Sequence, residues 1–131
     1  MTTSSPTPGH SPTLVDRLRR LFGGAPADGR LRSTVTAARA LELTQAGATL
    51  VDVRETHEWK SGHAPQAVHI PLGQIDLGAR RLQKGRPVVV VCASGMRSRT
   101  AAKQLRSLGY EAASLSGGMP AWQRAGGGVR R

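Results

Sequence analysis

The chain has 131 residues and a formal net charge of +11, with 38% hydrophobic and 21% charged residues. This length allows one domain whose apolar core needs neither a disulfide nor a metal. The single cysteine excludes an intramolecular disulfide and, beside only four histidines, argues against a structural zinc site, so we expect no metal and no cofactor.

The first 32 residues are expected to form a flexible, basic segment. Residues 1–13 are almost all Ser, Thr, Pro or Gly and cannot bury enough surface to order themselves. Residues 14–22 (LVDRLRRLF) place apolar side chains on one helical face and arginines opposite, which predicts a short amphipathic helix of unassigned role. The start does not resemble a secretory signal, and no apolar stretch is long enough to span a membrane. We therefore expect a cytoplasmic, reducing location.

Strand and helix patterns alternate between residues 33 and 123, and a flexible tail is expected at 124–131. Short apolar runs typical of buried strands lie at 48–54, 67–72, 86–92 and 112–115. Helical patterns lie at about 36–46, where Thr36 is the expected cap, at 98–109, and after the turn at Gly117 and Gly118. This alternation predicts a single α/β domain with a parallel sheet flanked by helices.

The segment VVVVCASGMRSRTAA (88–102) carries the chemistry. A buried strand ends at Cys92, a short loop with Gly95 and Arg97 follows, and a helix is expected near Ser98. Ligands of open α/β sheets bind beyond the carboxyl ends of the strands, which is where this order places the thiol. Backbone N–H groups that curl ahead of a helix, together with the arginine, are expected to lower the thiol pKa and make Cys92 a nucleophile.

Loop length separates two chemistries. Phosphatases that form a cysteinyl phosphate place one more residue between Cys and Arg than this chain does between Cys92 and Arg97. The shorter loop suits a single sulfur atom better than a phosphoryl group. A phosphatase or an arsenate reductase is therefore the second enzymatic choice.

Four stretches of residues 33–123 resemble the rhodanese family. They are LVDVRETHEWKSGH (50–63), HAPQAVHIPL (63–72), VVVVCASGMRS (88–98) and LSGGMPAW (115–122). The resemblance implies a sheet of about five parallel strands and transfer of a sulfane sulfur from thiosulfate or another persulfide donor to a thiol or cyanide. The chain departs from the family pattern at Gln66, at Ala64 and at Ala93, where a second basic residue is missing.

The resemblance also implies a role for each matching residue. Cys92 corresponds to the sulfur carrier, and Asp52 and Arg54 to a supporting ion pair near the site. The loop that holds the persulfide and the donor comprises Ala93, Ser94, Gly95, Met96 and Arg97. Trp59 and Trp122 are expected to fill the core.

Two further functions stay open. The domain could be a persulfide carrier or docking module that serves a protein partner, because no second cysteine is present to release the sulfur internally. The basic ends could instead bind nucleic acid or a membrane surface, since more than half of the excess positive charge lies outside 33–123. No basic run is interleaved with aromatic residues, so nucleic acid is not expected as a partner. The expected partners are a small anionic sulfur donor and a thiol or protein acceptor.

Overall fold

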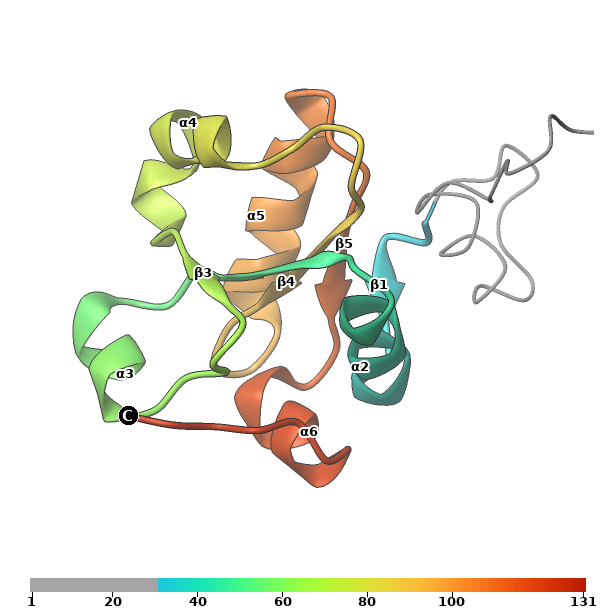
Figure 1. Ribbon diagram of the computed structural model, residues 1–131. Coiled ribbons are helices and arrows are strands. Elements are labelled where there is room, and N and C mark those ends of the chain that lie inside the picture. Colours follow the sequence, from blue (N-terminus) through green and yellow to red (C-terminus); the bar gives the residue numbers. More distant parts are fainter. Residues whose placement is uncertain (1–30) are drawn as a thin grey trace, which may run out of the picture.

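The computed structural model describes residues 31–131, so the helix expected at 14–22 lies outside the described residues. Five parallel strands form one sheet in the order β1-β5-β4-β2-β3 (Figure 1). The strands are β1 (Thr34–Val35), β2 (Thr49–Asp52), β3 (Val68–His69), β4 (Val88–Val91) and β5 (Ala112–Leu115). The helices are α2 (Ala37–Gln45), α3 (Thr56–Ser61), α4 (Ile75–Gly78), α5 (Met96–Ser107) and α6 (Gly118–Arg124), with 3-10 turns η1 (Leu72–Gln74) and η2 (Ala79–Arg81). The predicted α/β fold with a parallel sheet is confirmed.

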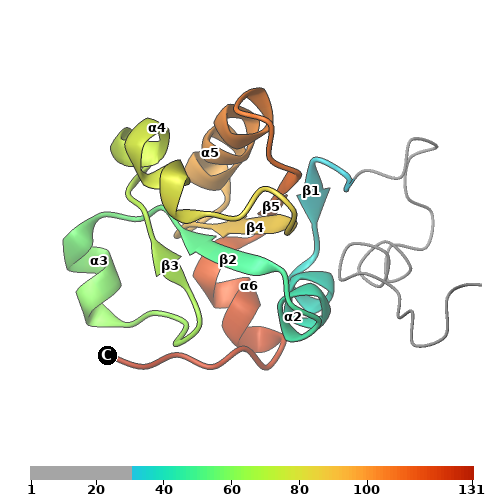
Figure 2. The same cartoon turned by 45° about the horizontal axis from the view of Figure 1, so that its top comes forward.

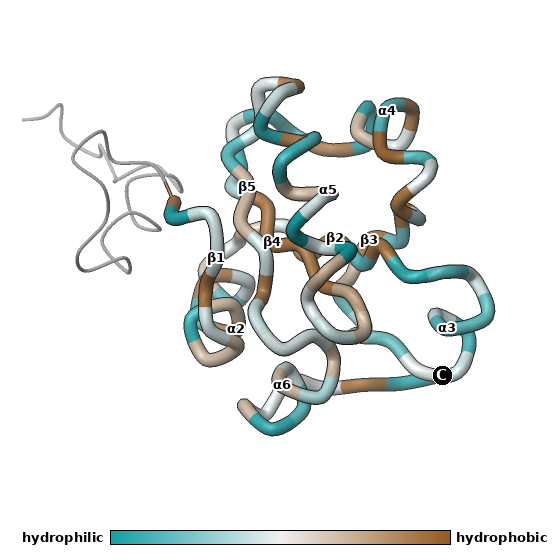
Figure 3. The backbone as a smooth tube through the Cα atoms, turned by 180° about the vertical axis from the view of Figure 1, so that it is seen from behind, coloured by the Kyte–Doolittle hydropathy of each residue, from teal (hydrophilic) through white to brown (hydrophobic). Residues whose placement is uncertain are grey.

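Helices cover both faces of the sheet. Figure 2 shows α4 and α5 on one side and α2 and α6 on the other. Alternate residues of the central strand β4 serve the two layers: Val88 and Val90 pack toward α5, whereas Val89 and Val91 pack toward α2 and α6. All four are fully buried, as expected for a parallel strand covered on both faces. Figure 3 accordingly shows β4 as hydrophobic and α3, at the sheet edge, as mostly hydrophilic.

Local signals explain where the helices begin. The side chain of Thr36 accepts a hydrogen bond from the backbone N–H of Arg39, which confirms the predicted cap of α2. Helix α5 begins at Met96, two residues before the predicted start. Gly95 has a φ of 113°, a left-handed conformation that reverses the chain within the loop and lets the helix begin at once.

The C-terminal segment 124–131, expected as a flexible tail, contacts the domain at several points. The indole Nε1–H of Trp122 donates to the carbonyl of Gly128 (2.9 Å), and Val129 packs on the core. His63 and Arg130 exchange two backbone hydrogen bonds of 2.8 Å each. Backbone pairing holds this Gly-rich segment, and Gly127 packs so closely on the Trp122 indole that a Cβ there would collide with the ring.

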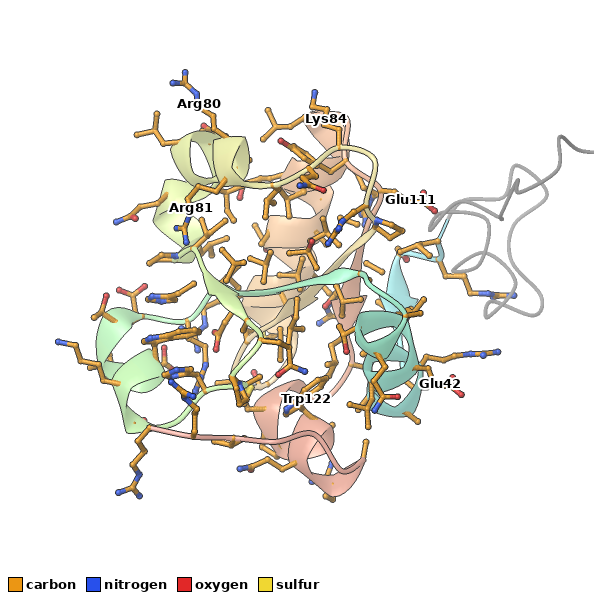
Figure 4. All side chains as sticks on the ribbon, viewed as in Figure 1. Glu42, Arg80, Arg81, Lys84, Glu111 and Trp122 are labelled. Carbon is orange, nitrogen blue, oxygen red and sulfur yellow. The ribbon has the colours of Figure 1, made fainter. Side chains whose placement is uncertain are left out.

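The two tryptophans have different environments. Trp122 is fully buried between α6 and the sheet, as predicted (Figure 4). Trp59 is only partly buried, and its ring stacks on those of His63 and His69 at centroid distances of 3.6 and 4.6 Å, so its prediction as a core residue is wrong. Within residues 31–131, no helix has the length and apolar character needed to cross a membrane.

Candidate active site

Cys92 directly follows β4 and is buried on the α5 side of the sheet. Its Sγ accepts hydrogen bonds from the backbone N–H groups of Gly95 (3.0 Å) and Ser98 (3.3 Å). The Ser98 Oγ lies 3.4 Å from the same sulfur. The loop therefore surrounds the thiol with dipoles whose positive ends point at it.

These contacts change the acidity of the thiol. Burial alone would raise the pKa of Cys92, because it disfavours the charged form. The hydrogen bonds from the hydroxyl and N–H of Ser98, and from the N–H groups of Gly95 and Ser94, outweigh burial and lower the pKa below its usual value. Neutral hydrogen-bond donors thus favour the thiolate form of Cys92, which is the form in which a cysteine is nucleophilic.

A buried pair of hydroxyls stands behind the sulfur. The Oγ atoms of Ser98 and Ser114 lie 2.7 Å apart, and the Ser98 hydroxyl also donates to the carbonyl of Gly95 (3.1 Å). Ser114 belongs to β5, the strand next to β4, and is fully buried. The single Ser98 proton serves the carbonyl of Gly95 while Cys92 is a thiol that donates to the Ser98 Oγ; once Cys92 is a thiolate, the hydroxyl can turn this proton to the sulfur and still accept from Ser114.

The turn between β5 and α6 supports the loop from outside. The N–H of Met119 donates to the carbonyl of Cys92 (2.9 Å). Gly118 has a φ of +65°, and a Cβ on it would collide with the backbone of Ala93 and Ser94. Only glycine permits both this conformation and this close approach.

Arg97 has a different partner from the one expected. Its two terminal nitrogens donate to the two carboxylate oxygens of Glu58 on α3, at 2.7 and 2.9 Å. The hydrogen bond from Arg97 is the main reason that the pKa of Glu58 is lowered to about 2. The same contact raises the pKa of Arg97. The guanidinium, expected to serve the sulfur, is engaged by a carboxylate.

Asp52 and Arg54 form the predicted ion pair at the end of β2. The Arg54 Nη2 donates to a carboxylate oxygen of Asp52 (2.7 Å) and to the carbonyl of Gly62 (2.7 Å). Both side chains are buried, and the pair connects β2 to the end of α3. Its position fits a supporting structural part.

The other loop residues differ in exposure. Met96 is 69% exposed at the start of α5, Ser94 is exposed, and Ala93 is partly buried. Among the described residues, no three His, Cys, Asp or Glu side chains are grouped so that they could hold a metal ion.

Sequence reasoning missed three residues of this site. The sequence predicts Ser98 only as a helix start, and it singles out neither Glu58 nor Ser114. Glu58 lies in one of the four stretches that resemble the rhodanese family, and that was the available signal.

Fold and site together define a class: α/β domains that hold a thiol of lowered pKa in a backbone-lined loop at the end of a central parallel strand. The family model described as Rhodanese-like domain matches residues 36–125. The chain belongs to the rhodanese-like domain family.

Curated relatives carry names from sulfur chemistry. The chain is 43% identical over 74 residues to the Bacillus subtilis (strain 168) protein named "Putative sulfurtransferase YtwF", covering 56% of this chain and 72% of that protein. It is 37% identical over 62 residues to "Putative sulfur carrier protein YrkF" of the same organism, covering 47% of this chain and 34% of that protein. The chain thus spans only a third of the second relative.

Solved structures agree on the fold. A rhodanese-related protein from Thermoplasma volcanium has a TM-score of 0.68 and 28% identity, with 76% of this chain and 98% of that chain covered. A rhodanese-like domain protein from Staphylococcus aureus has a TM-score of 0.67 and 27% identity, with 76% and 100% covered.

Proposed function

We propose that this protein is a sulfurtransferase that carries a sulfane sulfur as a persulfide on Cys92. The observation that carries the proposal is the group of hydrogen bonds from Gly95 and Ser98 to the Cys92 Sγ, which favour a thiolate. The same donors suit the terminal sulfur of a persulfide, which is also an anion when deprotonated. Residues 93–97 would hold the persulfide and the donor, and Asp52 with Arg54 would support them.

The reaction has two balanced steps. The Cys92 thiolate attacks the outer sulfur of thiosulfate or of an alkyl persulfide, an S–S bond forms on Cys92, and the donor's S–S bond breaks with its electron pair leaving on sulfite or on a thiolate. A second thiolate, or cyanide, then attacks the outer sulfur and restores the Cys92 thiolate. A reducing compartment such as the cytoplasm fits, because the cycle needs Cys92 as a free thiol.

Replacement of the thiol tests the site. We expect the wild-type protein to gain about 32 Da, one sulfur atom, on incubation with a sulfur donor, and to lose it on addition of a thiol. Cys92→Ser should gain no sulfur and transfer none, while its unfolding transition stays close to that of the wild type. Sulfur transfer by the Ser variant would refute the assignment.

A carrier is the second candidate. Cys92 is the only cysteine of the chain, so its sulfur must leave to an outside acceptor, and one relative is named a sulfur carrier. Turnover with small thiols and cyanide separates the two functions. Fast turnover indicates the enzyme, whereas a persulfide that is stable to small thiols and released only to a protein indicates the carrier.

A further inference from the structure

An anionic donor that approaches Cys92 needs a cation near it, and the described arginines around the loop differ in availability. Arg54 is engaged by Asp52 and the carbonyl of Gly62. Arg99 lines a hollow of about 170 Å³ together with Ser94 and Gly95, and neither Cys92 nor Arg97 is among the residues of that hollow. Arg97 is therefore the cation of the loop itself.

The charge of Arg97 is already neutralised. Both terminal nitrogens contact Glu58, in the two-point geometry that makes arginine–carboxylate pairs strong. The pKa of about 2 keeps Glu58 ionised throughout the neutral pH range. A dianionic donor at the loop would have to compete with this carboxylate for the guanidinium and would be repelled by its charge.

The two donor classes differ in the charge they bring. Thiosulfate is a dianion, and its leaving group, sulfite, also carries two charges that need a cation. An alkyl persulfide R–S–SH reacts by attack of the Cys92 thiolate on its outer sulfur. The S–S bond breaks, R–S⁻ leaves with the electron pair, and the outer sulfur keeps its proton. This reaction therefore depends little on the positive charge of Arg97.

Building on the proposed sulfur transfer, we infer that Glu58 is a specificity-determining residue: by pairing with Arg97 it disfavours thiosulfate and selects alkyl persulfides as sulfur donors. Selection of this kind works by penalising the wrong ligand. Glu58 acts through Arg97 and does not take part in the chemical step.

Glu58→Gln is the decisive variant because it removes the charge and keeps the shape. The Glu58 Oε1 also accepts a hydrogen bond from the backbone N–H of Glu55 (2.9 Å), which caps α3, and a glutamine oxygen can accept it as well. We expect kcat/KM for thiosulfate to rise about tenfold, while kcat/KM for an alkyl persulfide without carboxylate groups changes less than about twofold.

The matched control is Glu42→Gln. Glu42 pairs with Arg39 on α2, remote from the loop, and its replacement changes the net charge of the chain by the same amount (Figure 4). It should leave the ratio of the two kcat/KM values unchanged. A ratio that rises as much as in Glu58→Gln would mean that overall charge, not Glu58, sets the preference, and would overturn the inference.

Arg97→Gln, alone and combined with Glu58→Gln, completes a double-mutant cycle in which the ratio of the two activities should follow a fixed order. The ratio of thiosulfate to persulfide activity should be highest in Glu58→Gln, intermediate and similar in the wild type and the double variant, and lowest in Arg97→Gln. This order follows the net charge of the pair, and a residue with only a structural part would not produce it. If Glu58→Gln failed to fold, the lower ratio in Arg97→Gln would still be required.

Failure of the inference and failure of the proposed function are distinguishable. If the wild type gains sulfur on Cys92 from both donors with equal efficiency, or if Glu58→Gln lowers both activities alike, the inference is wrong and sulfur transfer stands. If the wild type gains sulfur from neither donor in an intact-mass measurement, the proposed function itself fails.

Discussion

The inner wall of the cysteine loop and its outer rim use different physics within a few residues of each other. The wall consists of neutral groups: the N–H groups of Gly95 and Ser98 donate to the sulfur, and the Ser98 Oγ lies 3.4 Å from it. The rim holds full charges, but Arg97 and Glu58 cancel one another there. The comparison indicates that neutral dipoles of the backbone and of Ser98 lower the pKa of the thiol, while the paired charges are inferred to govern which donor reaches it.

The largest expected effect on stability and sulfur transfer comes from displacing the cysteine loop by a substitution at Gly118, which packs against its backbone. In Gly118→Ala, the added Cβ would collide with the backbone of Ala93 and Ser94, and the left-handed conformation alone costs about 1–2 kcal/mol. We expect a free energy of unfolding lower by at least that amount in denaturant titration and a loss of most sulfur transfer.

Gly85→Ala is the control for this change, because a Cβ on Gly85 meets no atom within 4 Å. It should leave both stability and transfer close to wild type. Full transfer activity in Gly118→Ala would contradict the view that sulfur transfer depends on the position of the loop backbone around Cys92.

A smaller effect is expected from removing one donor of the wall. Ser98→Ala deletes the hydroxyl that helps to lower the pKa of Cys92, and a hydrogen bond to a charged group contributes about 1.5–3 kcal/mol. The thiol pKa should therefore rise, as measured from the pH dependence of alkylation. Since the thiolate is the nucleophile, the rise of the rate with pH moves to higher pH.

Ser107→Ala, on the exposed face of the same helix, should leave the pH profile unchanged. An unshifted profile in Ser98→Ala would remove the hydroxyl from the wall and leave the backbone N–H groups as the only donors.

The smallest expected effect concerns the rim. A carboxyl whose pKa is lowered on folding contributes stability above its unfolded pKa and loses that contribution as the pH falls through the folded pKa. Glu58 should therefore titrate near 2 by NMR of its side-chain carboxyl, and its stabilising contribution should vanish between about pH 4.5 and 2. In Arg97→Gln the midpoint should return toward 4.5, and a midpoint that stayed near 2 would contradict the assigned cause.

The sequence predicts helices and strands that have a regular hydrophobic pattern, and sites whose residues are close to one another in the chain. The apolar run of β4, the thiol at its end and Gly95 three residues later are all local, so the loop could be recognised before the structure was described. Glu58 could not, because its contact with Arg97 joins residues 39 apart and depends on β2 lying beside β4.

The C-terminal segment escaped prediction for another reason. Its attachment uses the backbone of Arg130 and the carbonyl of Gly128, and a Gly-rich stretch has no side-chain pattern that reports such pairing. Ser114 is a similar case, since its contact with Ser98 arises from the position of β5 next to β4.

The alternation of faces along β4 has a consequence for how this chain tolerates insertions. Because side chains alternate between the two faces along a strand, Cys92 points to the same side as Val88 and Val90. This alternation directs its sulfur to the α5 side. One residue inserted or deleted within the strand would turn the thiol toward Trp122 and α2, away from every donor that activates it. Changes in length are therefore compatible with reactivity only where a turn can absorb them, before the strand begins.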